Sequence, residues 1–362
     1  MVDIENMVEP LDIAEIDFQA LSASSPQQRL AALQQLDDAF KSYGIIYLSN
    51  HSIGQAMIDE AISWAFTYSP KSRRFFDLPS DIKKMIEHPR KAGDHRGWIR
   101  AGIGYVTQGI LCRDPAEVES MHEKASVEQM ESLETGKSHL ALHTHARNRL
   151  LPEETLPGFQ SFYAKWWAAC VNQELQILRA LCEILDISDL DYLGKQQTPD
   201  INCSQFGWNH YPSTPISSLK PGGNRLNTHS DYGQLTFLFQ DDVGGLESQD
   251  EAGIFRPVQP RRGTMIVQVA DMLERQSNGR WRSALHRVTT PPRVGYDSAV
   301  DENEELVDRY SIAFFAIPDY DTVIESLPGC EMKGKWHSLP WKEETTAGAW
   351  LMKRVALEYE RK

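Results

Sequence analysis

The sequence lacks long apolar runs, paired cysteines and a basic cluster, and each absence narrows the class of protein. No apolar run approaches the roughly 20 residues that a membrane-spanning helix needs. The five cysteines are scattered and form no CxxC motif, which favours buried free thiols in a reducing compartment over a disulfide framework. Acidic residues number 51 against 37 basic ones, for a net charge of -14. This excess argues against nucleic acid or an anionic membrane as the main partner.

The absence of a targeting signal leads to a further expectation. Residues 1–15 are acidic and do not show the basic-then-apolar pattern of a secretory signal peptide. We therefore expect a cytoplasmic protein. Because the chain shows no surface for a polymer, we expect its partner to be a small-molecule substrate, and we take a monomer as the default. Apolar residues make up 41 % of the chain, which is enough for a sizeable core. No linker composition divides the sequence, so residues 1–362 are interpreted as one domain.

The first part of the chain, residues 1–155, is predicted to be mostly helical. Ser25 and Pro26 are typical N-cap and first-turn residues of a helix, and Gly44 is a typical terminator. Residues 86–155 are polar and irregular, so we expect a lid or a substrate-facing loop there. Helices are expected over residues 25–44, over 54–68, from Ser80 and from Pro157, and a buried strand over 45–48.

The pattern changes after residue 200, where short β-type runs alternate with turn signals. Many short strands with such punctuation are typical of a β-sandwich or jelly roll, and we place this core within residues 200–320. A closing amphipathic helix is expected over residues 350–360. Strands are expected over residues 235–239, 245–248, 254–258, 265–269 and 310–316.

Three side chains in the second half have the residue types of a metal site. His229 and Asp231 are two positions apart, so in a strand both point to the same side. His286 follows the turn-like segment 276–283, which could bring the strand of His286 next to the strand that carries His229 and Asp231. Two imidazoles and one carboxylate leave the opposite coordination positions open. That set suits a non-haem Fe(II) centre that activates dioxygen.

Arg309 and Ser311 distinguish this interpretation from its main alternative. Two histidines and an aspartate would also suit a zinc hydrolase or a non-catalytic metal-binding module, but zinc does not account for Arg309. Apolar residues alternate with Arg309 and Ser311 over 309–314, so the arginine is predicted to face inward. A buried guanidinium needs an anion, and its planar fork matches a carboxylate.

Further motifs give the chain a resemblance to a known family. It resembles the isopenicillin N synthase-like group of Fe(II)- and 2-oxoglutarate-dependent oxygenases over nearly its whole length. Three departures from the family pattern remove no predicted ligand: Ser52, Ser230 and Ala270 stand where glycine, threonine and glycine are usual. The motifs that carry the resemblance are YGIIYLSNHSI at 43–53, FFDLP at 75–79, RGW at 96–98, NHYP at 209–212 and QDDVGGLE at 240–247.

The resemblance implies a fold, a cofactor set and roles for individual residues. The implied fold is α+β with a mainly β core, a double-stranded β-helix (jelly roll, cupin-like) flanked by α-helices. By the resemblance, His229, Asp231 and His286 bind Fe(II). Arg309 and Ser311 would hold the distal carboxylate of 2-oxoglutarate, and Asn209 and Tyr211 would contact the same cosubstrate. The candidate substrate contacts, from motif order alone, are Arg96, Trp98 and Phe315.

The implied reaction consumes 2-oxoglutarate and O2 and oxidises an unactivated C–H bond of a small molecule, as in secondary metabolism. Hydroxylation, desaturation and oxidative cyclisation remain open. An isopenicillin N synthase-type cyclase that uses no 2-oxoglutarate is the alternative within the oxidases. In such an enzyme Arg309 and Ser311 would bind a carboxylate of the substrate itself.

Overall fold

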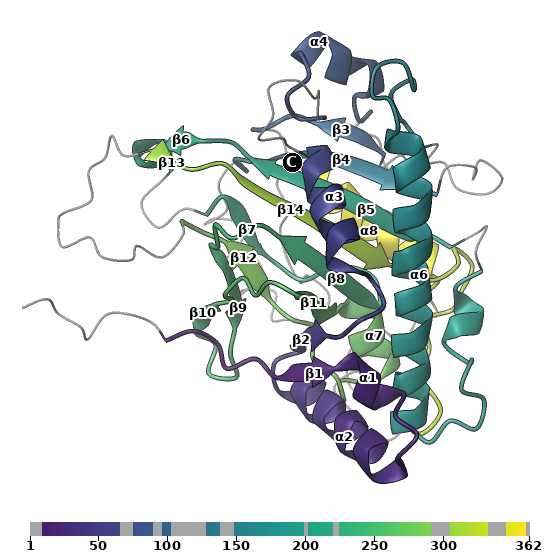
Figure 1. Ribbon diagram of the computed structural model, residues 1–362. Coiled ribbons are helices and arrows are strands. Elements are labelled where there is room, and N and C mark those ends of the chain that lie inside the picture. The colour runs from purple at the N-terminus through teal and green to yellow at the C-terminus, as the bar shows by residue number, and fades with distance from the viewer. Residues whose placement is uncertain are drawn as a thin grey trace, which may run out of the picture.

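A computed structural model of the chain describes residues 9–65, 75–89, 96–102, 128–137, 148–198, 202–219, 224–290, 305–331 and 345–359. Its centre is a pair of β-sheets that face each other, with helices on the outside (Figure 1). The helices are α1 (Phe18–Leu21), α2 (Pro26–Ser42), α3 (Gln55–Ala65), α4 (Ser80–Lys83), α6 (Phe159–Ile184), α7 (Asp271–Gln276) and α8 (Ala347–Tyr359).

The larger sheet has eight strands in the order β1-β2-β11-β8-β14-β5-β4-β3. Only its β1–β2 pair is parallel, and every other neighbouring pair is antiparallel. The strands are β1 (Glu15–Asp17), β2 (Ile45–Ser49), β3 (Gly97–Ile99), β4 (Glu131–Gly136), β5 (Gln205–Tyr211), β8 (Leu235–Gln240), β11 (Thr264–Val269) and β14 (Arg309–Ala316).

The smaller sheet has four antiparallel strands in the order β10-β9-β12-β7. A short pair, β13 with β6, lies apart from both sheets. These strands are β6 (Thr214–Pro215), β7 (Leu226–His229), β9 (Leu246–Gln249), β10 (Phe255–Pro257), β12 (His286–Val288) and β13 (Glu305–Leu306). Together the two sheets form the jelly roll that the strand pattern predicts.

The two faces of the larger sheet carry different side chains because strand residues alternate. On β14, Ile312 and Phe314 face the main hydrophobic core, whereas Arg309 and Ser311 face the space between the sheets. Helix α6 packs on the core face with Trp166, which lies 4.8 Å from the ring of Phe239. In Figure 1, α6 and α3 lie in front of the sheet and α8 lies behind it.

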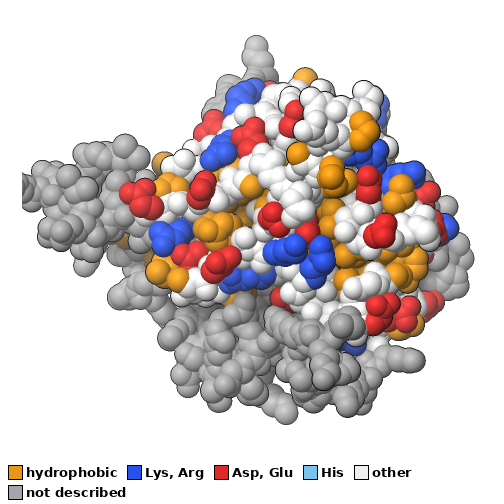
Figure 2. All heavy atoms as spheres, turned by 90° about the horizontal axis from the view of Figure 1, so that it is seen from below, with side chains coloured by type: hydrophobic (Ala, Val, Ile, Leu, Met, Phe, Trp, Pro, Cys, Tyr) orange, Lys and Arg blue, Asp and Glu red, His pale blue; other side chains and the backbone are white. Residues whose placement is uncertain are grey.

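Charged and apolar side chains are mixed on the surface, whereas the cysteines that the structure describes are buried. In Figure 2, acidic and basic side chains alternate with apolar ones on the face seen from below. Four cysteines are buried and free, namely Cys170, Cys182, Cys203 and Cys330, while Cys112 lies outside the described residues. Within those residues, no helix is long and apolar enough to span a bilayer.

Several local predictions differ from the structure. Ser25 and Pro26 take the predicted N-cap and first-turn positions of α2, although Ser25 makes no capping hydrogen bond. Ser80 is the first residue of α4 and Pro79 takes the cap position. The predicted turn before His286 is confirmed, since residues 277–281 form turns and bends between α7 and β12. The described part of the irregular segment 86–155 contributes β3 and β4 to the larger sheet. The sequence did not predict these two strands, because each is short and has one polar face, and neither therefore contains a long apolar run.

Candidate metal centre and adjoining pocket

The three predicted metal ligands converge at the end of the smaller sheet. His229 ends β7 and His286 begins β12, and antiparallel pairing places the two residues opposite each other. Their ring centroids lie 4.1 Å apart. Asp231 follows two residues after His229, and its Oδ1 lies 3.7 Å from Nε2 of both histidines. Within the described residues this is the cluster that could hold a metal ion, and all three members are buried.

Hydrogen bonds to the backbone fix the orientation of both imidazoles. Nδ1 of His229 lies 2.8 Å from the carbonyl oxygen of Asn227, and Nδ1 of His286 lies 3.0 Å from that of Ala284. A carbonyl can only accept, so each Nδ1 donates, and each neutral ring presents the Nε2 lone pair toward the other ligands. Burial, with the neighbouring His286 as a second cause, holds the pKa of His229 well below its usual range.

One carboxylate oxygen of Asp231 lacks a hydrogen-bond partner among the described residues, which indicates that a cation belongs beside it. Its Oδ2 is buried, and it has no hydrogen-bond partner in the described part of the chain. An unsatisfied buried carboxylate oxygen is costly, and a cation between the three side chains would satisfy it. Two imidazoles and one carboxylate thus fit Fe(II), and three protein ligands would leave coordination positions for a cosubstrate.

Arg309, on the neighbouring sheet, has the environment of an anion-binding residue. Its guanidinium is buried; Nε donates to the carbonyl oxygen of Gly244 at 2.8 Å, and Nη2 donates to Oε1 of Gln240 at 2.9 Å. Nη1 lies 3.4 Å from the hydroxyl oxygen of Ser311. These acceptors are neutral, and no carboxylate among the described residues forms an ion pair with this arginine. A carboxylate ligand would place a negative charge at hydrogen-bond distance from the guanidinium.

Register places Asn209 and Tyr211 beside this arginine. On β5, Tyr211 pairs with Arg309 and Asn209 pairs with Ser311, so all four side chains line the same pocket. The centre of the Tyr211 ring lies 4.8 Å from the guanidinium carbon of Arg309 and 5.5 Å from that of Arg225. Burial raises the pKa of the Tyr211 hydroxyl, which therefore remains a proton donor at neutral pH.

The pocket between the sheets joins these groups to the metal ligands. It has a volume of about 150 Å³, and apolar side chains make up much of its wall. His229, Asp231, His286, Arg309 and Phe315 all line it. Its other walls include Met130, Leu226, Leu238, Leu246, Val288, Leu351 and Val355.

The three predicted substrate contacts differ in their position relative to the pocket. Phe315 lines the pocket, whereas Arg96 and Trp98 are absent from the described lining. Arg96 borders the pocket, because its Nη1 donates to Oε1 of the lining residue Gln205, and its Nη2 donates to the carbonyl oxygen of Ser204 at 3.3 Å. Nε1 of Trp98 donates to Glu131 at 2.8 Å on the core side of the sheet. Motif order along the chain does not reveal which face of a strand a side chain occupies.

Sequence patterns missed a residue that supports Arg309 and two residues that line the pocket. Gln240 holds the Arg309 guanidinium because β8 pairs with β14 and places Gln240 opposite Ser311. Leu351 and Val355 reach the pocket from α8, far along the chain. Strand pairing would have predicted Gln240 once the register was known. The two α8 residues give only the amphipathic signal of any packed helix.

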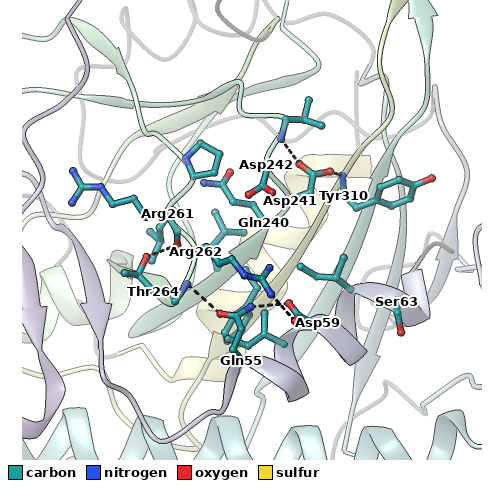
Figure 3. A pocket seen from close by; sticks show the side chains of 18 of the residues that line it. Gln55, Asp59, Ser63, Gln240, Asp241, Asp242, Arg261, Arg262, Thr264 and Tyr310 are labelled. Carbon is teal, nitrogen blue, oxygen red and sulfur yellow. Dashed lines mark hydrogen bonds and ion pairs between the residues drawn. The ribbon is translucent and has the colours of Figure 1, made fainter. Parts of the chain in front are cut away.

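A larger cleft, with a volume of about 1170 Å³, is lined by residues of α3, β8 and β11. Figure 3 shows that Arg262 reaches Asp59, that Gln55 accepts from the backbone of residue 263, and that Asp241 accepts from the backbone of Tyr310. Its charged groups are therefore largely engaged with one another or with the backbone. The cleft contains no histidine or cysteine in its described lining. The smaller inner pocket is thus the candidate catalytic site.

Two family models match the chain, and they cover different parts of it. The model of the 2OG-Fe(II) oxygenase superfamily matches residues 202–318. The model described as the non-haem dioxygenase in morphine synthesis N-terminal region matches residues 13–142. The first match contains all three candidate metal ligands together with Arg309 and Ser311.

Relatives and solved structures match over nearly the full length. The chain is 46 % identical to the 2-oxoglutarate-dependent dioxygenase lolO1 of Epichloe uncinata, over 98 % of this chain and 96 % of the relative. It is 34 % identical to the 2-oxoglutarate-dependent dioxygenase frbA of Dothideomycetidae sp. (strain 11243), over 92 % and 96 %. A full-length Neurospora crassa protein crystallised with alpha-KG superimposes with a TM-score of 0.77 at 26 % identity, over 98 % of both chains. The chain belongs to the 2OG-Fe(II) oxygenase superfamily and is a 2-oxoglutarate-dependent dioxygenase with a double-stranded β-helix fold.

Proposed function

We propose that this dioxygenase oxidises an unactivated C–H bond of a small, partly apolar molecule, with His229, Asp231 and His286 as the Fe(II) ligands. The observation that carries the proposal is the buried Oδ2 of Asp231, which lacks a partner among the described residues beside two oriented imidazoles. A structural zinc site would satisfy all its positions with protein ligands, whereas three ligands leave room for a cosubstrate.

We assign the cosubstrate position to the Arg309 side of the pocket. Arg309 and Ser311 would bind the distal carboxylate of 2-oxoglutarate, and Asn209 and Tyr211 would contact the same molecule. The two sites share one pocket, as a ligand that reaches from the guanidinium to the metal requires. The guanidinium could bind either carboxylate, and 2-oxoglutarate is supported over a carboxylate of the substrate because the named relatives are 2-oxoglutarate-dependent.

The chain's own contribution to the reaction is binding, orientation and exclusion of water. When bound, Fe(II) with 2-oxoglutarate and O2 supplies the oxidant. The apolar side chains of Leu226, Leu246 and Val288 limit the access of water and would position an apolar region of the substrate. The named relatives come from fungi, and we propose secondary metabolism as the setting of the reaction and residues 1–362 as one catalytic unit.

The experiment that tests this function is an anaerobic titration of the Fe(II)-loaded protein with 2-oxoglutarate. Chelation of the metal by the keto acid should produce a visible metal-to-ligand charge-transfer band. A screen of small molecules for substrate-stimulated succinate release would then follow. Iron binding without the band would favour the cyclase that uses no 2-oxoglutarate. A protein that binds zinc and gives no turnover with iron would contradict the proposal.

A further inference from the structure

The C-terminal helix α8 approaches the metal centre although it lies more than a hundred residues after the first ligand. Leu351 and Val355 are one helical turn apart and are 1 % and 4 % exposed. Both line the pocket that contains the metal ligands. Nothing in the strand pattern requires a helix there, so some contact must hold α8 in place.

An apolar cluster that includes Met272, Ile317 and Trp350 packs α8 against the rest of the chain, and a fully buried ion pair adds a specific polar contact. Arg354 lies between the two lining residues on α8, and its Nη1 pairs with Oδ2 of Asp271, the first residue of α7. The two side chains are 1 % and 2 % exposed. A pair so deeply buried is costly to desolvate and contributes little net stability. Its presence therefore suggests a role in positioning.

Both members of the pair also contact the segments that carry the ligands. Nη2 of Arg354 donates at 3.2 Å to the carbonyl oxygen of Ser230, the residue between His229 and Asp231. The Arg354 guanidinium also lies 4.2 Å from the ring of Tyr232. One arginine thus contacts the segment that carries two of the three metal ligands on both sides of Asp231.

Asp271 makes the corresponding contacts from the other side. Its backbone N–H donates to the carbonyl oxygen of Asp231 at 3.0 Å. Its Oδ1 accepts from the hydroxyl of Ser283 at 2.9 Å, three residues before His286. The pair therefore connects α8 to both ligand-bearing segments, β7 with its following loop and the approach to β12.

We propose that Arg354 and Asp271 are positioning residues of the metal centre, and that they fix α8 as a wall of the catalytic pocket. The inference rests on the proposed function, because it requires a metal at His229, Asp231 and His286. Removal of a residue that orients the metal ligands without binding the ion itself typically weakens metal binding by about 10- to 100-fold. The structure thus assigns the C-terminal helix to the catalytic centre itself.

The test separates positioning from simple stability by comparing single and double variants. Arg354→Met leaves Asp271 buried and unpaired, so it should lower the urea midpoint and weaken metal binding together. Arg354→Met/Asp271→Asn removes both charges, which is often nearly neutral for stability. We expect this double variant to recover most of the urea midpoint yet bind Fe(II) about tenfold more weakly than wild type. Its Co(II) complex should also show a shifted visible ligand-field band.

A matched control replaces another buried pair with the same chemistry. Nζ of Lys83 lies 2.9 Å from Oε2 of Glu131 on the core side of the sheet, so Lys83→Met/Glu131→Gln should leave Fe(II) affinity and the Co(II) band unchanged. Arg354→Lys keeps the charge but cannot reach Asp271 and Ser230 with a planar fork, and it should weaken Fe(II) binding to a smaller extent.

Each outcome decides between the two proposals. Wild-type affinity for Fe(II) and an unchanged Co(II) band in Arg354→Met/Asp271→Asn would overturn the positioning role alone. If that variant does not fold, Arg354→Lys decides, and unchanged affinity there overturns the role. Failure of the wild-type protein to bind either metal would instead refute the proposed function.

Discussion

At the residue scale, the cosubstrate site depends on a guanidinium whose partners in the described chain are all neutral. Arg309→Ala should leave Fe(II) binding nearly intact and weaken 2-oxoglutarate binding by about 100-fold or more, since a charge-assisted bidentate contact contributes on the order of 3 kcal/mol. The intensity of the anaerobic charge-transfer band as a function of 2-oxoglutarate concentration measures this directly.

A second arginine provides the control for this change. Arg256 on β10 pairs with Asp250 at 2.6 Å outside the pocket, so Arg256→Ala should not alter the titration. If Arg309→Ala bound 2-oxoglutarate with wild-type affinity, the assignment of the carboxylate site would be wrong. If Arg309→Ala and Arg256→Ala lost the same 2-oxoglutarate affinity, the cause would be the general loss of positive charge.

The metal ligands allow a second prediction at the same scale. His286→Ala should abolish stoichiometric Fe(II) binding and, with it, the charge-transfer band, because two ligands cannot hold the ion against water. Anaerobic equilibrium dialysis followed by metal analysis provides the measurement. His210→Ala offers a comparison, since His210 lies between Glu131 and Asp308 on the other face of β5 and should not affect iron content. Retention of stoichiometric iron by His286→Ala would exclude this histidine as a ligand.

At the element scale, the connection between α2 and β2 depends on a glycine. Gly44 has a φ of +68°, and a Cβ there would lie 1.8 Å from the carbonyl oxygen of Arg282. Gly44→Ala should therefore lower the free energy of unfolding by about 3 kcal/mol or more, of which roughly 1–2 kcal/mol is the left-handed backbone. Urea denaturation followed by circular dichroism measures the change.

Gly263 separates the two contributions. It has a similar φ of +83°, but a Cβ would meet nothing within 4 Å. Gly263→Ala should thus cost only the backbone conformation, about 1 kcal/mol. Equal losses at the two positions would show that the close approach of Arg282 to Gly44 contributes nothing.

Elements with a local signal could be predicted from the sequence, and their long-range pairing could not. Alternation over 309–314 correctly gave an inward Arg309, because side-chain period 2 is a property of the strand alone. Gln240 was missed because its position beside Arg309 follows from the register of β8 on β14. Arg96 and Trp98 entered the candidate set by motif order, which does not determine the face of the sheet. The approach of α8 to the metal ligands is a tertiary contact that no local pattern indicates.

At the scale of the whole molecule, metal binding should be coupled to folding. The candidate ligands come from β7, the loop after it and β12, so an unfolded chain cannot present them together. A ligand that binds only the folded state stabilises it by about 2.7 kcal/mol at 100 times its dissociation constant. Removal of iron with a chelator should lower the melting temperature in wild type and leave it unchanged in His286→Ala. Calorimetry under anaerobic conditions measures both, and equal melting temperatures for loaded and stripped wild type would contradict the coupling.

The pH dependence of stability should reflect a carboxyl group buried in α6. Glu174 is fully buried, both of its carboxylate oxygens lack partners in the described structure, and burial raises its pKa from 4.5 to about 8. The folded state therefore retains a proton that the unfolded state releases, and the stabilising contribution present below pH 4.5 is lost as pH rises toward 8. Glu174→Gln should remove this loss, on the order of a few kcal/mol, so that its stability exceeds that of wild type increasingly as pH rises from 5 to 8. Urea midpoints measured across that range test the prediction, and parallel curves for the two proteins would show that Glu174 is ionised in the folded state.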